Sequence, residues 1–181
     1  MPLNLEYKKE FLITIMGPIF QFIAYFLLLK IFNNNHLVKA YHYGILEFNL
    51  LPIYPLDGGK LCNIFLNKLI PYKKSLKCII LISYFITIFL LFSSKRITIN
   101  IIITYILLIF LIRKEEIKIP FQYNKFLLER YLNNFSFKKK KIISHYNNFY
   151  KYRENILKIG NKIYSEKEYL REKYDNFYKK C

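Results

Sequence analysis

The chain has 181 residues, of which 54% are hydrophobic, and it carries a formal net charge of +17. This combination excludes a disordered polypeptide, which requires low hydrophobicity, and it argues against an ordinary soluble domain, so we expect a membrane protein with a basic portion. The cysteines, Cys62, Cys78 and Cys181, show neither a disulfide framework nor the CxxC pairs of a zinc ribbon.

Four stretches are apolar enough to enter a bilayer, where one helical pass takes about 20 apolar residues. The first is residues 11–32, whose Gly-Pro pair at 17–18 predicts a kink or a close helix contact. The second, residues 43–66, is interrupted by a proline-rich motif. Residues 76–92 and 97–112 are the third and fourth. We therefore expect an all-α integral membrane protein with about four transmembrane helices, one of them broken.

The distribution of basic residues predicts the orientation of these helices. Eighteen of the 29 Lys and Arg residues follow residue 112, and others lie before the first helix and in the loop from Lys68 to Lys77. With four passes, all of these fall on one side of the membrane, and the positive-inside rule makes that side the cytoplasm. We expect both termini to be cytoplasmic, in a bacterial cell membrane.

Two domains are expected, a membrane domain of residues 1–112 and a basic cytoplasmic tail of residues 113–181. The tail is interpreted as helical, because apolar residues recur at helical spacing after Pro120, which can start a helix. Ser165 and Glu168 have the spacing of a helix capping box.

The lysine run at residues 138–141 is interpreted as a solvated charge run, with binding to anionic lipid or to nucleic acid as the alternatives. No nucleic-acid-binding signature accompanies the charge. The expected partner of the chain is therefore the lipid bilayer, and no nucleic-acid partner is expected.

The sequence FNLLPIYPLDGG, residues 48–59, interrupts the second apolar stretch. Its two prolines cannot both lie in a regular helix, because each lacks a backbone donor and clashes with the preceding turn. Non-helical backbone at membrane depth is tolerated only where protein or a wet cavity surrounds it. The carboxylate of Asp57 costs about 2.5–3.5 kcal/mol there on insertion scales, so it is usually paired, metal-bound or functional. The alternative is an ordinary polar turn outside the membrane, since Asp-Gly is a strong turn signal.

This motif resembles the N-x-x-P-x-x-P-L-D-G-G signature of the site-2-protease family of intramembrane zinc metalloproteases, and most of all its sporulation-linked member in endospore-forming bacteria. The segment KKEFLITIMGPIFQ also resembles the family's Gly-Pro helix, and NKFLLERYL, residues 124–132, resembles a cytoplasmic segment that follows the last helix. The resemblance implies that Asp57 is a zinc ligand beside an unwound, substrate-receiving segment. The residues that match this segment are Asn49, Pro52, Pro55, Gly58 and Gly59.

By this resemblance, zinc is the implied cofactor and a membrane-anchored protein is the implied substrate. Catalytic zinc takes three protein ligands and activates a bound water. In the family the other two ligands and the general base come from H-E-x-x-H on a helix, and this sequence has no such motif. His36, His42 and His145 have neither a neighbouring Glu nor i, i+4 spacing, so they are not expected to bind zinc.

We therefore expect no catalytic residue in this sequence. The chain is interpreted as the C-terminal part of a protease, active only when an N-terminal H-E-x-x-H half, expected upstream of Met1, completes the zinc site. Two alternatives remain: a non-catalytic membrane protein that keeps the family's helices, as a scaffold or inhibitor of a true protease, and a membrane-tethered basic module in which the motif is incidental. The expected protein partner is the H-E-x-x-H half or a regulatory membrane protein.

Overall fold

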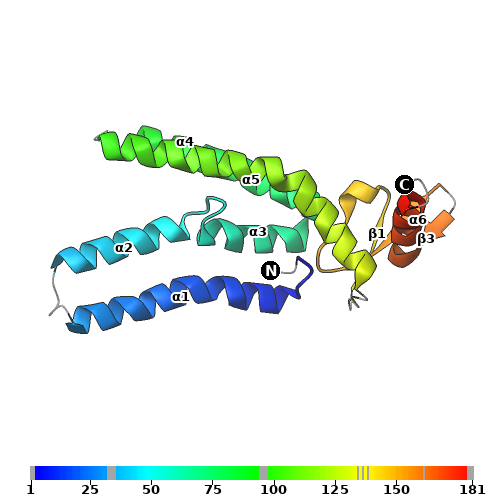
Figure 1. The fold of residues 1–181 in the computed structure, drawn as a ribbon, viewed down its shortest axis with the longest axis horizontal. Coiled ribbons are helices and arrows are strands. Elements are labelled where there is room, and N and C mark those ends of the chain that lie inside the picture. Colours follow the sequence, from blue (N-terminus) through cyan, green and yellow to red (C-terminus); the bar gives the residue numbers. More distant parts are fainter. Residues whose placement is uncertain are drawn as a thin grey trace.

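The computed structural model describes residues 3–31, 36–93, 98–133, 135, 137, 139–160 and 162–178. Figure 1 shows helices α1 to α5 side by side in an elongated group, with the strands and α6 gathered beyond one end of it. The elements in chain order are α1 (Tyr7–Ile31), α2 (His36–Leu50), α3 (Asp57–Leu69), α4 (Tyr72–Ser93), α5 (Ile99–Leu132), β1 (Lys140–Ile143), the 3₁₀ turn η1 (Tyr146–Asn148), β2 (Glu154–Ile159), β3 (Lys162–Tyr164) and α6 (Glu166–Tyr178).

Helices α1 and α4 are long and apolar enough to cross a bilayer. Helix α1 buries little against the rest of the chain, and large apolar side chains such as Phe20, 65% exposed, cover its outer surface. An apolar surface of this extent is unfavourable in water and suits a helix surrounded by lipid. The structure therefore supports a membrane protein with two candidate membrane-spanning helices.

The predicted break in the second apolar stretch is confirmed. Helix α2 ends at Leu50, α3 begins at Asp57, and residues 51–56 between them are not helical. Pro52 and Pro55 explain the break, because neither can donate the backbone hydrogen bond that a continuing helix needs.

Helices α4 and α5 pack against each other, and α5 continues without interruption past residue 112 to Leu132. The expected boundary between membrane domain and tail therefore lies inside α5. Pro120 also lies inside this helix and does not start one, so that expectation was wrong. A proline removes a single helical hydrogen bond, whereas Ile119 and Tyr123 on either side of it are buried in the core and hold the helix in place.

The tail is not purely helical, and that prediction was wrong. It contains a three-stranded sheet of order β1–β2–β3, in which β1 and β2 are parallel and β2 and β3 antiparallel. In β2 the side chains of Asn155 and Leu157 are buried while those of Glu154 and Ile156 are half-buried, the two-residue period of a strand. We call the strands, η1 and α6, with the residues that connect them, the tail unit.

The capping box at the start of α6 is confirmed. Backbone N–H of Ser165 donates to Glu168 Oε2 at 2.9 Å, and backbone N–H of Glu168 donates to Ser165 Oγ at 3.3 Å. These hydrogen bonds lower the pKa of the Glu168 carboxyl, because its charged form accepts the backbone donor. The box satisfies two donors that a helix start otherwise leaves unpaired.

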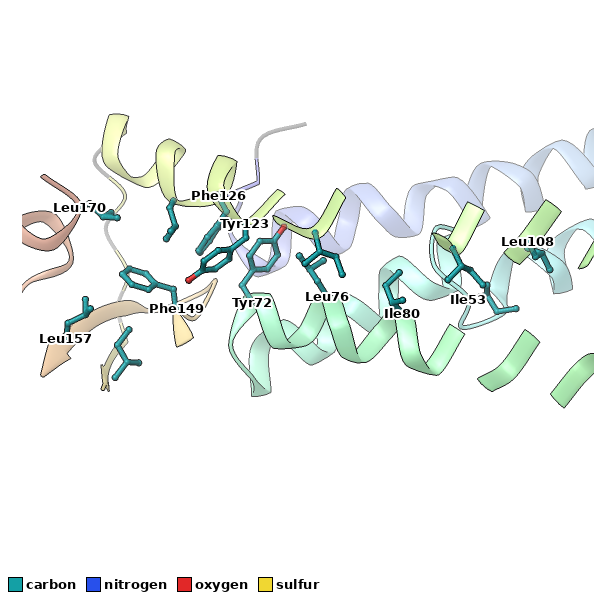
Figure 2. Close-up of a cluster of buried hydrophobic side chains, with 14 residues drawn as sticks. Ile53, Tyr72, Leu76, Ile80, Leu108, Tyr123, Phe126, Phe149, Leu157 and Leu170 are labelled. Atoms are coloured by element: carbon teal, nitrogen blue, oxygen red, sulfur yellow. The ribbon is translucent and has the colours of Figure 1, made fainter. Parts of the chain in front are cut away.

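One run of buried side chains joins the tail unit to the helices and reaches the broken segment, as Figure 2 shows. Leu108 of α5 and Ile53, fully buried in the loop between α2 and α3, lie at one end of this run, and Leu157 of β2 and Leu170 of α6 lie at the other. The labelled members between the two ends are Ile80, Leu76, Tyr72, Tyr123, Phe126 and Phe149. The tail unit and the helices therefore share a single hydrophobic core.

Candidate functional site

Asp57, the predicted zinc ligand, is the first residue of α3 and follows directly on the non-helical segment. Its carboxylate packs against α1, where a Cβ built on Gly17 would lie only 2.9 Å from Asp57 Oδ2. Lys60 Nζ donates to the other oxygen, Oδ1, at 2.9 Å, and both side chains are partly exposed. Gly17 of the Gly-Pro pair is thus the residue that lets α1 approach the carboxylate, which confirms the predicted close contact.

The glycine pair after Asp57 lies directly beneath the broken segment. A Cβ on Gly58 would be 2.1 Å from the carbonyl oxygen of Leu50, and one on Gly59 would be 2.4 Å from the carbonyl carbon of Ile53. These distances are far shorter than van der Waals contact, and the opposing atoms are backbone. Glycine is therefore required at both positions for the loop to rest on the first turn of α3.

Gly58→Ala is expected to destabilise the folded protein by about 3 kcal/mol, the upper range for overpacking, because neither backbone can move away without opening the motif. Gly44→Ala is the matched control: Gly44 lies within α2 with no atom within 4 Å of an added Cβ. Alanine favours helix over glycine there by up to about 1 kcal/mol. Denaturant unfolding of both variants in detergent measures the difference, and equal stability of the two would contradict the close packing at Gly58.

Two hydrogen bonds fix the broken segment between neighbouring helices. Asn49 Nδ2 donates to Gln21 Oε1 of α1 at 3.0 Å, and the backbone N–H of Tyr54 donates to Ser83 Oγ of α4 at 2.8 Å. Asn49 was predicted as a site residue, whereas Gln21 and Ser83 were not. Their signal was present, since each is a polar side chain inside a long apolar run, where polar groups usually have a role.

The histidines lie apart from Asp57 in the fold. His36 starts α2, the His42 ring lies 5.6 Å from that of Tyr25, and His145 accepts a hydrogen bond from Asn147 in the tail unit. Within the described residues, no group of three or more His, Cys, Asp or Glu side chains could hold a metal ion. Asp57 offers one carboxylate, so the described residues alone do not form a zinc site.

An open cavity of about 370 Å³ adjoins the motif at Tyr54 and Lys60 and is lined by residues of α1, α3, α4, α5 and the tail unit. Inside it Glu10 of α1 accepts hydrogen bonds from Lys151 Nζ at 2.5 Å and from the Tyr152 hydroxyl at 2.6 Å. Burial lowers the pKa of the Lys151 ammonium, and the carboxylate of Glu10 opposes that effect. The cavity therefore connects the broken segment with the contact between α1 and the tail unit.

No family model matches this chain. Its sequence is 39% identical over 79 residues to Stage IV sporulation protein FB of Bacillus subtilis (strain 168). The predicted resemblance is confirmed. The match covers 40% of this chain and 27% of Stage IV sporulation protein FB, so the chain spans about a quarter of the length of that relative.

Proposed function

We propose that this chain is part of a sporulation-linked intramembrane zinc protease of the site-2-protease type. The observation that carries the proposal is the position of Asp57: a partly exposed carboxylate on the first turn of α3, directly after a non-helical segment fixed between α1 and α4. The similarity to Stage IV sporulation protein FB supports it. In this proposal Asp57 is one zinc ligand, and an H-E-x-x-H helix outside the printed sequence supplies the other two and the general base.

In the proposed topology the chain crosses the bilayer four times, through α1, the broken pair α2–α3, α4 and α5, and both termini lie in the cytoplasm. Three contacts support this arrangement: Leu3 N–H donates to Glu129 of α5, Glu10 pairs with Lys151, and Tyr72 N–H donates to the carbonyl of Phe149. They place the N-terminus, the start of α4 and the tail unit at one end of the helices (Figure 1). Most basic residues are found at this end, as a cytoplasmic side requires.

The proposed substrate is a membrane-anchored protein, an extended stretch of which would lie along residues 51–56. The fixed loop and the cavity beside Tyr54 support this assignment, because irregular backbone at membrane depth is stable where it lines a cavity. The second candidate function is a non-catalytic scaffold of the same family. It is favoured by the lack of further metal ligands around Asp57 within the described residues.

Zinc content separates the two functions. The chain is co-expressed with an H-E-x-x-H transmembrane segment of Stage IV sporulation protein FB, the two are purified together, and metal is measured by mass spectrometry. About one zinc per complex is expected with that segment and none with the chain alone, because catalytic zinc needs three protein ligands. A co-purified complex without zinc would overturn the protease proposal and establish the scaffold instead.

A further inference from the structure

A second cavity, a groove of about 470 Å³ between α4 and α5, shares no lining residue with the one beside the motif. At one end it is lined by Lys73 and Lys77 on the first turns of α4, and further along by Leu81 and Tyr84. Glu116 of α5 lies opposite. Its volume lies within the range of about 300–1,000 Å³ that is usual for sites binding small molecules.

The basic end of the groove lies at the end of α4 that contacts the tail unit. Lys73 Nζ donates to Asn147 Oδ1 at 3.0 Å and lies 5.2 Å from the centre of the Tyr123 ring. Lys77 is exposed, and within the described residues it forms no ion pair. Both lysines, which lie within two turns of the start of α4, line the groove, and within the described residues neither forms an ion pair with a carboxylate.

Among the described residues that line the groove, Glu116 is the one carboxylate, and its charge is paired. Glu116 accepts from Arg113 Nη1 at 2.7 Å and from the Tyr84 hydroxyl at 3.1 Å. The charge of Glu116 is balanced by Arg113 on its own helix, so it does not offset the positive charges of Lys73 and Lys77. The groove keeps a positive end and is complementary to a single anionic group.

Beyond the lysines, the surface of α4 is apolar and faces outward. Leu81 begins a row of exposed side chains that continues with Phe85, 72% exposed, and Ile88. Helix α4 is a candidate membrane span, so this row would lie among lipid acyl chains. A basic end followed by an apolar row matches a phospholipid, with its phosphate at the membrane surface and its acyl chains below.

We propose that this groove binds one acidic phospholipid, with the headgroup phosphate between Lys73 and Lys77 and an acyl chain along Leu81 and Phe85. Basic pockets between transmembrane helices on the cytoplasmic side bind such headgroups in other membrane proteins. The proposal requires α4 to lie in a bilayer but does not depend on proteolysis. Because Lys73 also contacts Asn147, the bound headgroup lies where the membrane meets the tail unit.

The test is native mass spectrometry of the purified chain with phosphatidylglycerol or phosphatidylcholine that carry the same acyl chains. The unmodified chain is expected to retain phosphatidylglycerol in preference to phosphatidylcholine. Lys77→Gln is expected to weaken phosphatidylglycerol binding about fivefold, which is about 1 kcal/mol for one basic residue near an anionic headgroup, and to leave phosphatidylcholine binding unchanged.

Lys8→Gln is the matched control, because Lys8 is an exposed lysine in the first turn of α1 at the same end of the helices and outside the groove. It is expected to bind phosphatidylglycerol like the unmodified chain. Equal losses in Lys8→Gln and Lys77→Gln would mean diffuse attraction to negative lipid and overturn the site. Equal binding of the two lipids, or full displacement of phosphatidylglycerol by an equal concentration of glycerol 3-phosphate, would overturn it as well.

Discussion

In the protein completed by an H-E-x-x-H helix, Asp57→Asn is expected to lower zinc content and proteolysis by more than about 100-fold. Changes to groups that only orient a ligand typically cost about 10–100-fold, and removal of a charged ligand should exceed that. Folding should survive, because asparagine has the same shape and the lost ion pair with Lys60 is partly exposed and worth at most about 1 kcal/mol. Zinc analysis and cleavage of a membrane-anchored substrate measure the effect.

Lys60→Met is the matched control for this experiment. It breaks the same 2.9 Å ion pair but leaves the carboxylate of Asp57 in place. Zinc content and cleavage close to those of the unmodified protein are therefore expected. Near-normal cleavage by Asp57→Asn would remove Asp57 from the zinc ligands, and equal losses in both variants would assign the effect to the ion pair.

Arg130→Met is expected to destabilise the protein by about 3–5 kcal/mol, the usual result of removing one partner from a buried ion pair. The Arg130 side chain is 1% exposed, and its Nη1 pairs with Glu166 Oε1 at 2.6 Å. Burial lowers the pKa of this guanidinium, and Glu166 opposes the effect. The other oxygens that accept from Arg130 are Asn4 Oδ1 and the carbonyls of Tyr150, Lys151 and Arg153.

Denaturant unfolding and limited proteolysis of the tail unit measure this loss. Arg171→Met on the exposed surface of α6 is the control and should change stability by about 0.5 kcal/mol or less. The double variant Arg130→Met/Glu166→Met should recover little of the stability, because Glu166 Oε2 also accepts from the buried backbone N–H of Asn155 at 2.7 Å, and this donor would lose its partner together with the acceptors of Arg130. If Arg130→Met is as stable as Arg171→Met, Arg130 does not hold the tail unit to α5.

The broken helix could be predicted from the sequence, because its cause is local. Pro52 and Pro55 exclude a regular helix regardless of what surrounds them. The capping box of Ser165 and Glu168 was equally predictable, since its donors and acceptors lie within one helical turn.

The sheet in the tail could have been predicted from one signal that was overlooked. Gly160 and the next residue separate two short apolar-rich strands, a pattern typical of a two-residue hairpin. Gly160 has a φ of 58°, which glycine adopts at no steric cost. The parallel pairing of β1 with β2 has no such local signal, because it depends on residues that are separated along the chain.

The sequence marks Gln21 and Ser83 as unusual polar residues in apolar runs, but it does not show which residues they bind, for the same reason. Gln21 lies 28 residues before Asn49, and Ser83 lies 29 residues after Tyr54, so only the folded arrangement of α1 and α4 brings each pair together. The need for Gly17 opposite Asp57 also arises only from the approach of two helices.

Because the helices and the tail unit share one hydrophobic core, the order of their synthesis determines when this core can be completed. Ribosomes deliver the helices first and the tail unit last, and Phe149 and Leu157 of the tail unit belong to the same buried cluster as Tyr72 and Leu76 of α4. Until those late residues leave the ribosome, α4 and the loop that it supports through Ser83 lack part of their final contacts. The core that the tail unit shares with the helices is therefore complete only after the tail has been synthesised and has docked on them.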